Sequence, residues 1–254
     1  MKKVKAYFQT DQGRVRPHNE DDGGVFYNRT GQMLAIIADG MGGHQAGDVA
    51  SKMATSFVRD KWQQTDDFNS SEASETWLKE TLEEANLALL EHAQNNEACA
   101  GMGTTVVGVI CTDEFIAVAH VGDSRCYKLS GEGFVQITED HSLVNELVRS
   151  GQISEEDAEH HPRKNVLLKA LGTETDIAAD TQSMKWEREN KLLLCSDGLT
   201  NKVTDEELSS FIKKDPDLGA VSNDMVELAN NRGGEDNISL VIVHHDTTVE
   251  EGET

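Results

Sequence analysis

The chain has 254 residues, of which 46 are Asp or Glu and only 23 are Lys or Arg, so its formal net charge is −23. Such an acidic surface repels phosphate backbones and anionic lipids, which excludes nucleic acid and membrane surfaces as expected partners. The length allows one large domain or two small ones, and we expect one, because only three prolines occur and no Pro-, Ser- or Gly-rich linker interrupts the chain.

Apolar runs and helical periodicity predict the main elements along the chain. In chain order they are a strand at 33–38 (MLAIIA), helices at 47–62 and 72–94, strands at 104–112, 115–121 and 191–196, helices at 204–211 and 217–231, and a strand at 237–245. Several strands are apolar on both faces, which is typical of sheets covered on each side. Thr204 and Glu207 have the spacing of a capping box that opens a helix.

The order of these elements does not alternate strictly between strand and helix, which argues against a doubly wound parallel sheet. Mostly antiparallel sheets with helices packed outside fit better. Residues 140–172 differ from the rest, because two short helical patterns are mixed with charge there, and we interpret this segment as a lid or insert.

The four cysteines show no CxxC spacing, and the start MKKVKAYFQT lacks the apolar segment of a secretion signal. We therefore expect reduced, mostly structural thiols in a soluble, cytoplasmic protein. No apolar stretch approaches the roughly 20 residues that a spanning helix needs. The histidine pairs at 160–161 and 244–245 are interpreted as solvated loop and strand-end residues.

Acidic residues next to Gly or Asn recur at the ends of the predicted strands. Asp39 follows MLAIIA within ADGMGGH, Asp197 follows KLLLCS, Asp123 follows FIAVAHV, and Asp236 precedes NISLVIV. Any one of these could be an ordinary turn. If sheet packing brings them together, their mutual repulsion requires a cation, and oxygen ligands without Cys or clustered His favour Mg²⁺ or Mn²⁺. Spacing alone leaves both interpretations open.

Eight segments, taken in order, resemble the metal-dependent serine/threonine protein phosphatases of the PPM (type 2C) family in their compact bacterial form. They are GRVRPHNED (13–21), ADGMGGH (38–44), GMGTT (101–105), VGDSRCY (121–127), DHS (140–142), LGT (171–173), SDGL (196–199) and GGEDNIS (233–239). They cover almost the whole chain, and each alone would be a weak signal.

The resemblance implies an α+β fold, an αββα sandwich of two mostly antiparallel sheets flanked by helices, with metals between the sheets at one end. It implies a single catalytic domain over residues 1–246, with a flap near the active site at roughly 142–172. Residues 247–254 would be an acidic C-terminal tail.

The resemblance also implies roles for individual residues. Asp39 would bridge two Mg²⁺ or Mn²⁺ ions, with the Gly40 carbonyl on the second. Asp197 and Asp236 would complete the first ion, and Glu20 and Asp21 would anchor the second, partly through water. Asp123 matches the acid that holds a third, looser ion in bacterial relatives. Arg16 matches the residue that grips the substrate phosphate.

The implied reaction is hydrolysis of phosphoserine and phosphothreonine by a hydroxide that bridges the two ions. Animal relatives carry their catalytic His directly after Asp-Gly, at the position that Met41 occupies in this chain. Here His44 stands three residues later. It would either protonate the departing oxygen or only place the substrate, and Arg125 is interpreted as structural. The expected partners are phosphorylated proteins and, by analogy, a Ser/Thr kinase, and we expect a monomer. The alternative is a phosphatase-fold regulatory or binding module with little or no turnover.

Overall fold

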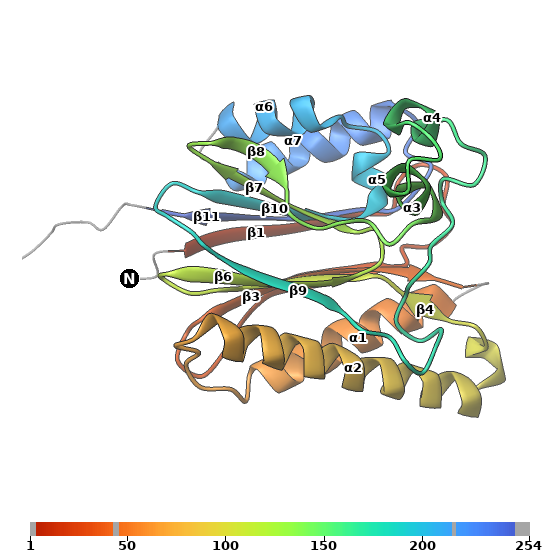
Figure 1. Cartoon of the computed structure of the whole chain (residues 1–254), viewed down its shortest axis with the longest axis horizontal. Helices are drawn as coiled ribbons and strands as arrows, with labels where there is room; N and C mark the ends of the chain where they lie inside the picture. The colour runs from red at the N-terminus through yellow and green to blue at the C-terminus, as the bar shows by residue number, and fades with distance from the viewer. Residues whose placement is uncertain (1–3, 43–45, 215–216, 247–254) are drawn as a thin grey trace, which may run out of the picture.

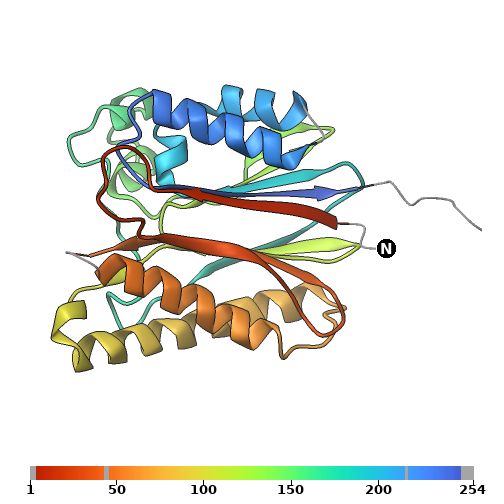
Figure 2. The same cartoon turned by 180° about the vertical axis from the view of Figure 1, so that it is seen from behind.

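The computed structural model describes residues 4–42, 46–214 and 217–246. Two antiparallel sheets face each other, and helices cover the outer side of each sheet (Figures 1 and 2). The α+β class and the αββα sandwich expected from the sequence are thereby confirmed.

The first sheet has five strands in the order β1-β11-β10-β7-β8, and all its pairings are antiparallel. Its strands are β1 (Val4–Asp11), β7 (Arg125–Ser130), β8 (Gly133–Gln136), β10 (Lys191–Cys195) and β11 (Ile238–His245). Its central strands β10 and β11 are almost entirely buried, because helices cover one face and the second sheet covers the other.

The second sheet follows the order β2-β3-β5-β6-β9, with the short strand β4 paired to the end of β3. Its strands are β2 (Asp21–Tyr27), β3 (Met33–Met41), β4 (Gly103–Thr104), β5 (Val106–Cys111), β6 (Phe115–Val121) and β9 (Asp180–Lys185). The first and second sheets share an apolar layer that contains Ile37, Val109, Leu194 and Val241.

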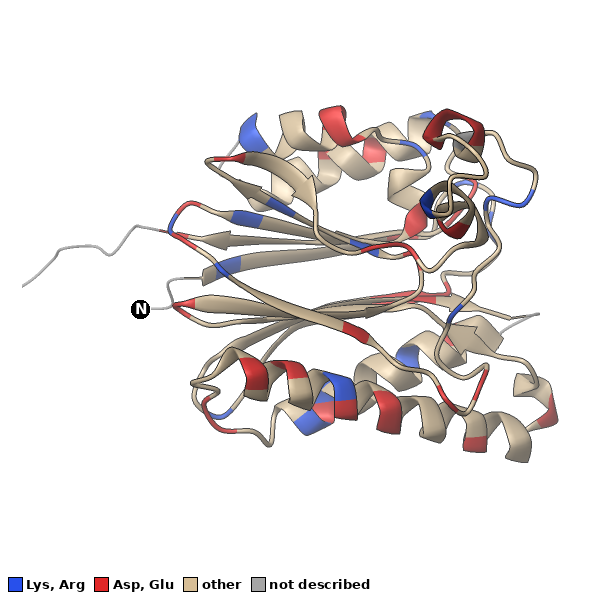
Figure 3. Cartoon of the chain, in the orientation of Figure 1, with Lys and Arg blue, Asp and Glu red and all other residues tan. Residues whose placement is uncertain are grey.

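Two further apolar layers join the helices to the sheets. Helices α1 (Ala46–Trp62) and α2 (Ser71–Asn95) pack on the second sheet, and α6 (Asp205–Lys214) and α7 (Leu218–Asn231) pack on the first. The remaining helical segments are η1 (Glu97–Cys99), α3 (Leu143–Arg149), α4 (Glu155–Glu159) and α5 (Asp197–Thr200). Acidic residues are spread over both helical layers and over α4 (Figure 3).

The long apolar elements agree with the sequence predictions within a few residues, and Thr204 and Glu207 make the expected capping box. The prediction for His244 and His245 was wrong. Both side chains are buried in β11, and the ring of His245 stacks on Trp186 at 4.7 Å between centroids. All four cysteines are free and buried.

Strand register places the candidate residues at one end of the sandwich. Strands β3, β6 and β10 all finish there, and β11, antiparallel to β10, begins there. The same end carries β4, α5 and α3, whereas β1 begins and β11 finishes at the opposite end (Figure 1). Within residues 4–42, 46–214 and 217–246, no helix is both long and apolar enough to cross a bilayer.

Candidate active site

Asp39 and Asp21 form a cross-strand pair at the site end of the second sheet, where β2 and β3 meet in antiparallel register. Such directly opposed side chains lie close together. Burial, with repulsion from Asp21, Asp197 and other nearby carboxylates, raises the pKa of Asp39 well above its usual range. Burial likewise raises the pKa of Asp21 to about 7. Two opposed acids at this depth are destabilising unless a cation or protons offset their charge.

Three more acids reach the same place from other elements. Asp197 begins α5 directly after β10 and Ser196, Asp236 precedes β11, and Asp123 follows β6 by one glycine. Burial and repulsion from Asp236 raise the pKa of Asp197. Burial and repulsion from Asp197 raise the pKa of Asp123 to about 7. Aspartates from four separate parts of the chain therefore act electrostatically on one another.

Glu20 and Gly40 lie where the loop before β2 meets the end of β3. The Gly40 amide donates a hydrogen bond to the Glu20 carbonyl at 3.0 Å. A Cβ on Gly40 would lie 2.1 Å from the Gly47 carbonyl oxygen, so only glycine allows α1 to begin so close to β3. Burial raises the pKa of Glu20, and its Oε1 is buried without a hydrogen-bond partner among the described residues.

Arg16 extends over the acids from the loop between β1 and β2. Its Nη2 donates to Asp236 Oδ2 at 2.7 Å, and its Nη1 lies 4.0 Å from Glu20 Oε2. The side chain is 45% exposed, so the guanidinium can also be reached from solvent. The hydrogen bond to Asp236 raises the pKa of Arg16, which is therefore cationic at any working pH.

Two of the sequence interpretations concern other residues near the site. His44 lies outside the described residues. Arg125 is structural, as expected, because its guanidinium makes a forked contact with Asp140, with Nη2 donating to Oδ2 at 2.8 Å. Its Nη1 also donates to the Tyr127 hydroxyl.

The polar residues that hold these acids in place were not among the site residues predicted from the sequence. Asn237 binds the backbone of the Arg16 loop at three points, accepting from the Glu20 amide and donating to the Gln12 and His18 carbonyls. The Ser196 hydroxyl donates to Asp21 Oδ2 at 2.8 Å. These residues sit inside the quoted motifs GGEDNIS and SDGL, which is the only signal that could have identified them.

Thr104 and Thr105 of GMGTT fix the backbone of Asp39. The Thr104 hydroxyl and the Thr105 amide both donate to the Asp39 carbonyl, at 2.9 Å each, and the Asp39 amide donates to the Thr105 hydroxyl. The segment is a tight entry into a buried strand, and it also holds one of the candidate acids in place.

The donor set fits hard divalent cations. All candidate side chains are carboxylates, and Asp21 Oδ1, like Glu20 Oε1, is buried without a hydrogen-bond partner among the described residues. Carboxylate oxygens without thiolate or imidazole are the ligands that Mg²⁺ and Mn²⁺ prefer. A cation would satisfy the orphaned oxygens and offset the burial and mutual repulsion that raise the pKa values of these acids.

Comparison with known proteins finds similarity over almost the whole chain. The family described as "Protein phosphatase 2C" matches residues 12–232. The serine/threonine phosphatase stp of Listeria monocytogenes is 47% identical over 245 residues, covering 96% of this chain and 97% of that protein. The crystal structure of the serine/threonine phosphatase Stp1 from Staphylococcus aureus has a TM-score of 0.90 at 37% identity, covering 95% of this chain and 94% of the other.

A further solved structure bears on the acidic cluster. The catalytic domain of the serine threonine protein phosphatase PstP, described as a complex with two manganese ions, has a TM-score of 0.83 at 28% identity. It covers 95% of this chain and 97% of that domain.

Proposed function

This chain belongs to the protein phosphatase 2C family, and on that premise we propose which of its residues carry out the reaction. It is a metal-dependent protein serine/threonine phosphatase, an enzyme class that acts on phosphoproteins. The single observation behind the assignment of residues is that strand register brings carboxylates from β2, β3, the β10–α5 junction and the segment before β11 to one end of the sandwich. Asp21 is buried there and the others are half-buried, and burial with mutual repulsion raises the pKa values of Asp21, Asp39 and Asp197.

Asp39 is proposed to bridge two divalent cations, with the Gly40 carbonyl beside it. Asp197 and Asp236 would hold the first cation, and Glu20 and Asp21 the second. Asp123 would hold a third, more weakly bound cation. The manganese complex of the related PstP domain supports Mn²⁺, and the all-oxygen donor set is compatible with Mg²⁺ as well.

Bound divalent cations supply Lewis acidity, which acidifies water and offsets charge on the phosphoryl oxygens. The carboxylates determine where the cations would be held. Buried and partly buried hydrogen bonds keep these acids in place, from Ser196 to the Asp21 carboxylate and from Thr105 and Asn237 to the backbone amides of Asp39 and Glu20. Arg16 is proposed to bind the substrate phosphate, because its planar fork donates two parallel hydrogen bonds to phosphate oxygens. Its present partner, Asp236, keeps the guanidinium over the acids.

His44 keeps the two roles that the sequence left open, proton donation to the departing serine or threonine oxygen and placement of the substrate. The flap is proposed to comprise roughly residues 142–172, within one catalytic domain over residues 1–246. The helices α3 and α4 lie in that segment. The acidic tail at 247–254 lies outside the described residues.

The finer cellular assignments also rest on the family. A Ser/Thr protein kinase and its targets are proposed partners, and we infer a cytoplasmic monomer. With a net charge of −23, the enzyme should favour phosphopeptides with basic neighbours, because acidic ones are repelled.

Hydrolysis of a phosphothreonine peptide tests both the activity and the residue assignment. We expect turnover with Mn²⁺, none with excess chelator, and a loss of at least about 10³-fold in kcat for Asp39→Asn, because that change removes a shared metal charge. Asp224→Asn, an exposed change on α7, is the matched control and should behave like the unchanged enzyme. Full turnover by Asp39→Asn would refute the assignment. Mn²⁺ binding without turnover in the unchanged protein would instead indicate a binding module.

A further inference from the structure

His141 makes two hydrogen bonds to Gly122, the residue directly before Asp123. The His141 amide donates to the Gly122 carbonyl at 3.0 Å, and the Gly122 amide donates to His141 Nδ1 at 3.0 Å. The side chain of His141 is only 9% exposed. A buried backbone N–H needs a partner, and for Gly122 that partner is an imidazole.

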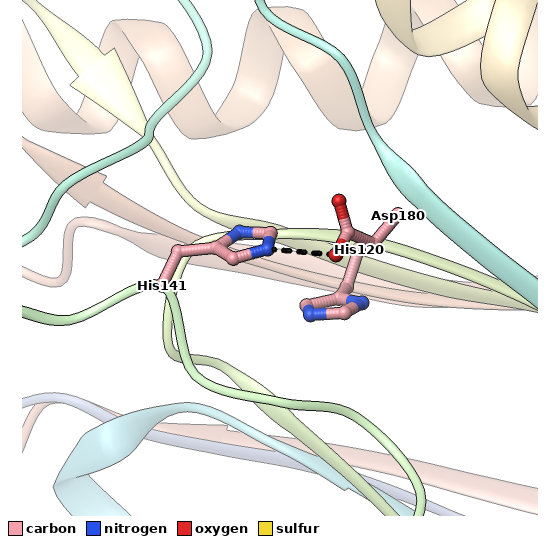
Figure 4. Close-up of side chains that lie close together, drawn as sticks. All are labelled: His120, His141 and Asp180. Carbon is pink, nitrogen blue, oxygen red and sulfur yellow. Dashed lines mark ion pairs between the residues drawn. The ribbon is translucent and has the colours of Figure 1, made fainter. Parts of the chain in front are cut away.

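These hydrogen bonds assign the tautomers of two stacked histidines. Because His141 Nδ1 accepts, the neutral ring carries its proton on Nε2, which lies 3.3 Å from Asp180 Oδ2 (Figure 4). His120 Nε2 is 2.8 Å from the Glu139 carbonyl, so the proton of that ring also lies on Nε2. The rings stack at 4.6 Å between centroids with 12° between their planes.

His120, His141 and Asp180 could be mistaken for a metal site, because their ligand atoms all lie within 4.8 Å of one another. A metal would need the lone pair of a nitrogen that faces the other two residues. The lone pair of His141 Nδ1 accepts from the Gly122 amide, and Nε2 carries the proton of the neutral ring, so neither nitrogen offers a lone pair to a metal. The nitrogen lone pairs of an imidazole lie in the plane of the ring. Because the two rings are stacked nearly parallel, their lone pairs lie in separate planes and do not converge on one point. We therefore interpret the two histidines as neutral rings that support the neighbouring turn, beside the ionised Asp180.

The turn that His141 holds is also fixed from its other side. Gly122 has φ +109°, and a Cβ there would lie 2.6 Å from Cβ of Thr105, so only glycine fits. The Thr105 hydroxyl bonds the Ser124 hydroxyl at 2.7 Å and also accepts from the Asp39 amide. Asp123 thus sits in a turn clamped between Thr105 and His141.

His141 also joins this turn to the base of the proposed flap. The His141 carbonyl accepts from the Leu168 amide at 2.8 Å, and Leu143 donates to the Val166 carbonyl at 2.8 Å. Burial, with His120 and Lys169 nearby, lowers the pKa of His141, in agreement with a neutral ring. His141 therefore contacts the returning segment of the flap at Leu168 as well as the turn that carries Asp123.

We propose that His141 is a positioning residue, whose neutral Nδ1 holds the Gly122 amide and thereby keeps Asp123 in place for the most weakly bound cation. This inference rests on the role proposed above for Asp123. We therefore expect that any hydrogen-bond acceptor at the Nδ1 position is enough to hold the Gly122 amide, and that an imidazole ring is not required.

Two substitutions distinguish the need for an acceptor at the Nδ1 position from the need for an imidazole ring. His141→Asn places a carbonyl oxygen near the Nδ1 position and keeps an acceptor for Gly122, whereas His141→Gln places its amide near the Nε2 position and leaves the Gly122 amide unpaired. Titration calorimetry with Mn²⁺ should show the weakest binding step weakened about tenfold in His141→Gln, as expected for one buried donor left without a partner. In His141→Asn the same step should stay within about threefold of the unchanged protein.

Hydrogen exchange gives a readout independent of activity. The Gly122 amide should exchange faster in His141→Gln and stay protected in His141→Asn. His160→Gln, an exposed histidine of the same flap segment, is the control for substitution itself and should change neither measurement. If His141→Gln does not fold, His141→Asn still decides the question, because loss of the weak step in that variant overturns the acceptor role.

Asp123→Asn separates this inference from the proposed function. Mn²⁺ binding by Asp123→Asn that matches the unchanged protein would refute the role of Asp123 itself. Loss of the weak step in Asp123→Asn, together with unchanged binding and Gly122 protection in His141→Gln, would overturn the positioning role of His141 alone.

Discussion

Arg16 is a cationic side chain in direct contact with the candidate acids, and it contacts them unequally. The hydrogen bond to Asp236 is 2.7 Å long, whereas Glu20 lies 4.0 Å away. Nearly half of the side chain is exposed, so this pair is only modestly stabilising. Arg16 is therefore placed to exchange its carboxylate contact for a phosphate group without a large cost to the fold.

Arg16→Ala should lower kcat/KM for a phosphopeptide by about 10²-fold, because a bidentate, charge-assisted contact to the phosphate is lost. Mn²⁺ affinity should not fall, since Arg16 supplies no metal ligand and its removal takes a competing cation away from Asp236. Steady-state kinetics and calorimetry on the same preparation measure both quantities. Arg14→Ala, an exposed arginine of the same loop, is the control. Unchanged kcat/KM in Arg16→Ala would contradict the phosphate-binding role.

Among individual residues, the sequence identified candidate acids but did not identify the residues whose hydrogen bonds hold those acids in place. Asp39 and Asp197 could be singled out because each follows an apolar strand. Ser196, Thr105 and Asn237 could not, because their roles depend on hydrogen bonds across as many as 225 positions of sequence. A hydroxyl or amide that binds a distant backbone group leaves no local pattern.

The strands also differ in how well the sequence predicts them. Buried strands such as β6 and β10 are continuous apolar runs, and the sequence located them almost to the residue. Strand β2 was missed because it reads DDGGVFY, and β9 because it reads DTQSMK. Gly23 in β2 is required by close packing, since a Cβ there would lie 2.5 Å from the Ile36 carbonyl oxygen. Tertiary contacts thus produce strands that propensity disfavours.

The short helix α5 positions Asp197 by packing tightly on the segment before β11. A Cβ on Gly198 would lie 1.9 Å from the Asn237 carbonyl oxygen, and backbone atoms cannot move aside cheaply. Gly198→Ala should therefore push α5 away from Asp236 and Asn237. We expect a loss of about 1–3 kcal/mol in unfolding free energy, or roughly 5 °C in Tm.

Weaker Mn²⁺ binding should accompany that loss of stability, because Asp197 and Asp236 would separate although neither is substituted. Thermal unfolding and calorimetry are the measurements. Gly131→Ala, in the hairpin between β7 and β8 where a new Cβ meets nothing within 4 Å, should leave both unchanged. Normal stability and normal Mn²⁺ affinity in Gly198→Ala would show that α5 tolerates displacement.

In the whole molecule, the antiparallel register of the strands brings together acids that no local motif could place side by side. It places the C-terminal ends of β3, β6 and β10 beside the N-terminal end of β11, and so gathers acids that are up to 215 positions apart, from Asp21 to Asp236. The order of apolar and helical segments indicated antiparallel sheets. The convergence of the acids was implied only by the family resemblance, since spacing leaves turns and ligands indistinguishable.

Gathering these acids makes the stability of the metal-free protein depend on pH in an unusual direction. The pKa values of Asp21 and Asp123 are about 7 in the fold, against 3.8 for an ordinary Asp, so the folded state binds more protons than the unfolded state between those values. Stability therefore falls as pH rises through 7. The lowered pKa values of His141 and His244 act in the opposite sense, but their effect is complete above about pH 6.5.

We expect the Tm of the chelator-treated protein to fall between pH 6.5 and 8, and the rise in Tm on adding Mn²⁺ to grow over the same range, because protons and cations compete for the same carboxylates. Asp39→Asn removes one charge from the cluster and should make the metal-free decline shallower. Scanning calorimetry at constant ionic strength measures these effects and keeps the screening of the −23 net charge fixed. A metal-free Tm that is constant or rises from pH 6.5 to 8 would mean that the pKa values of these carboxylates are not raised in the folded protein.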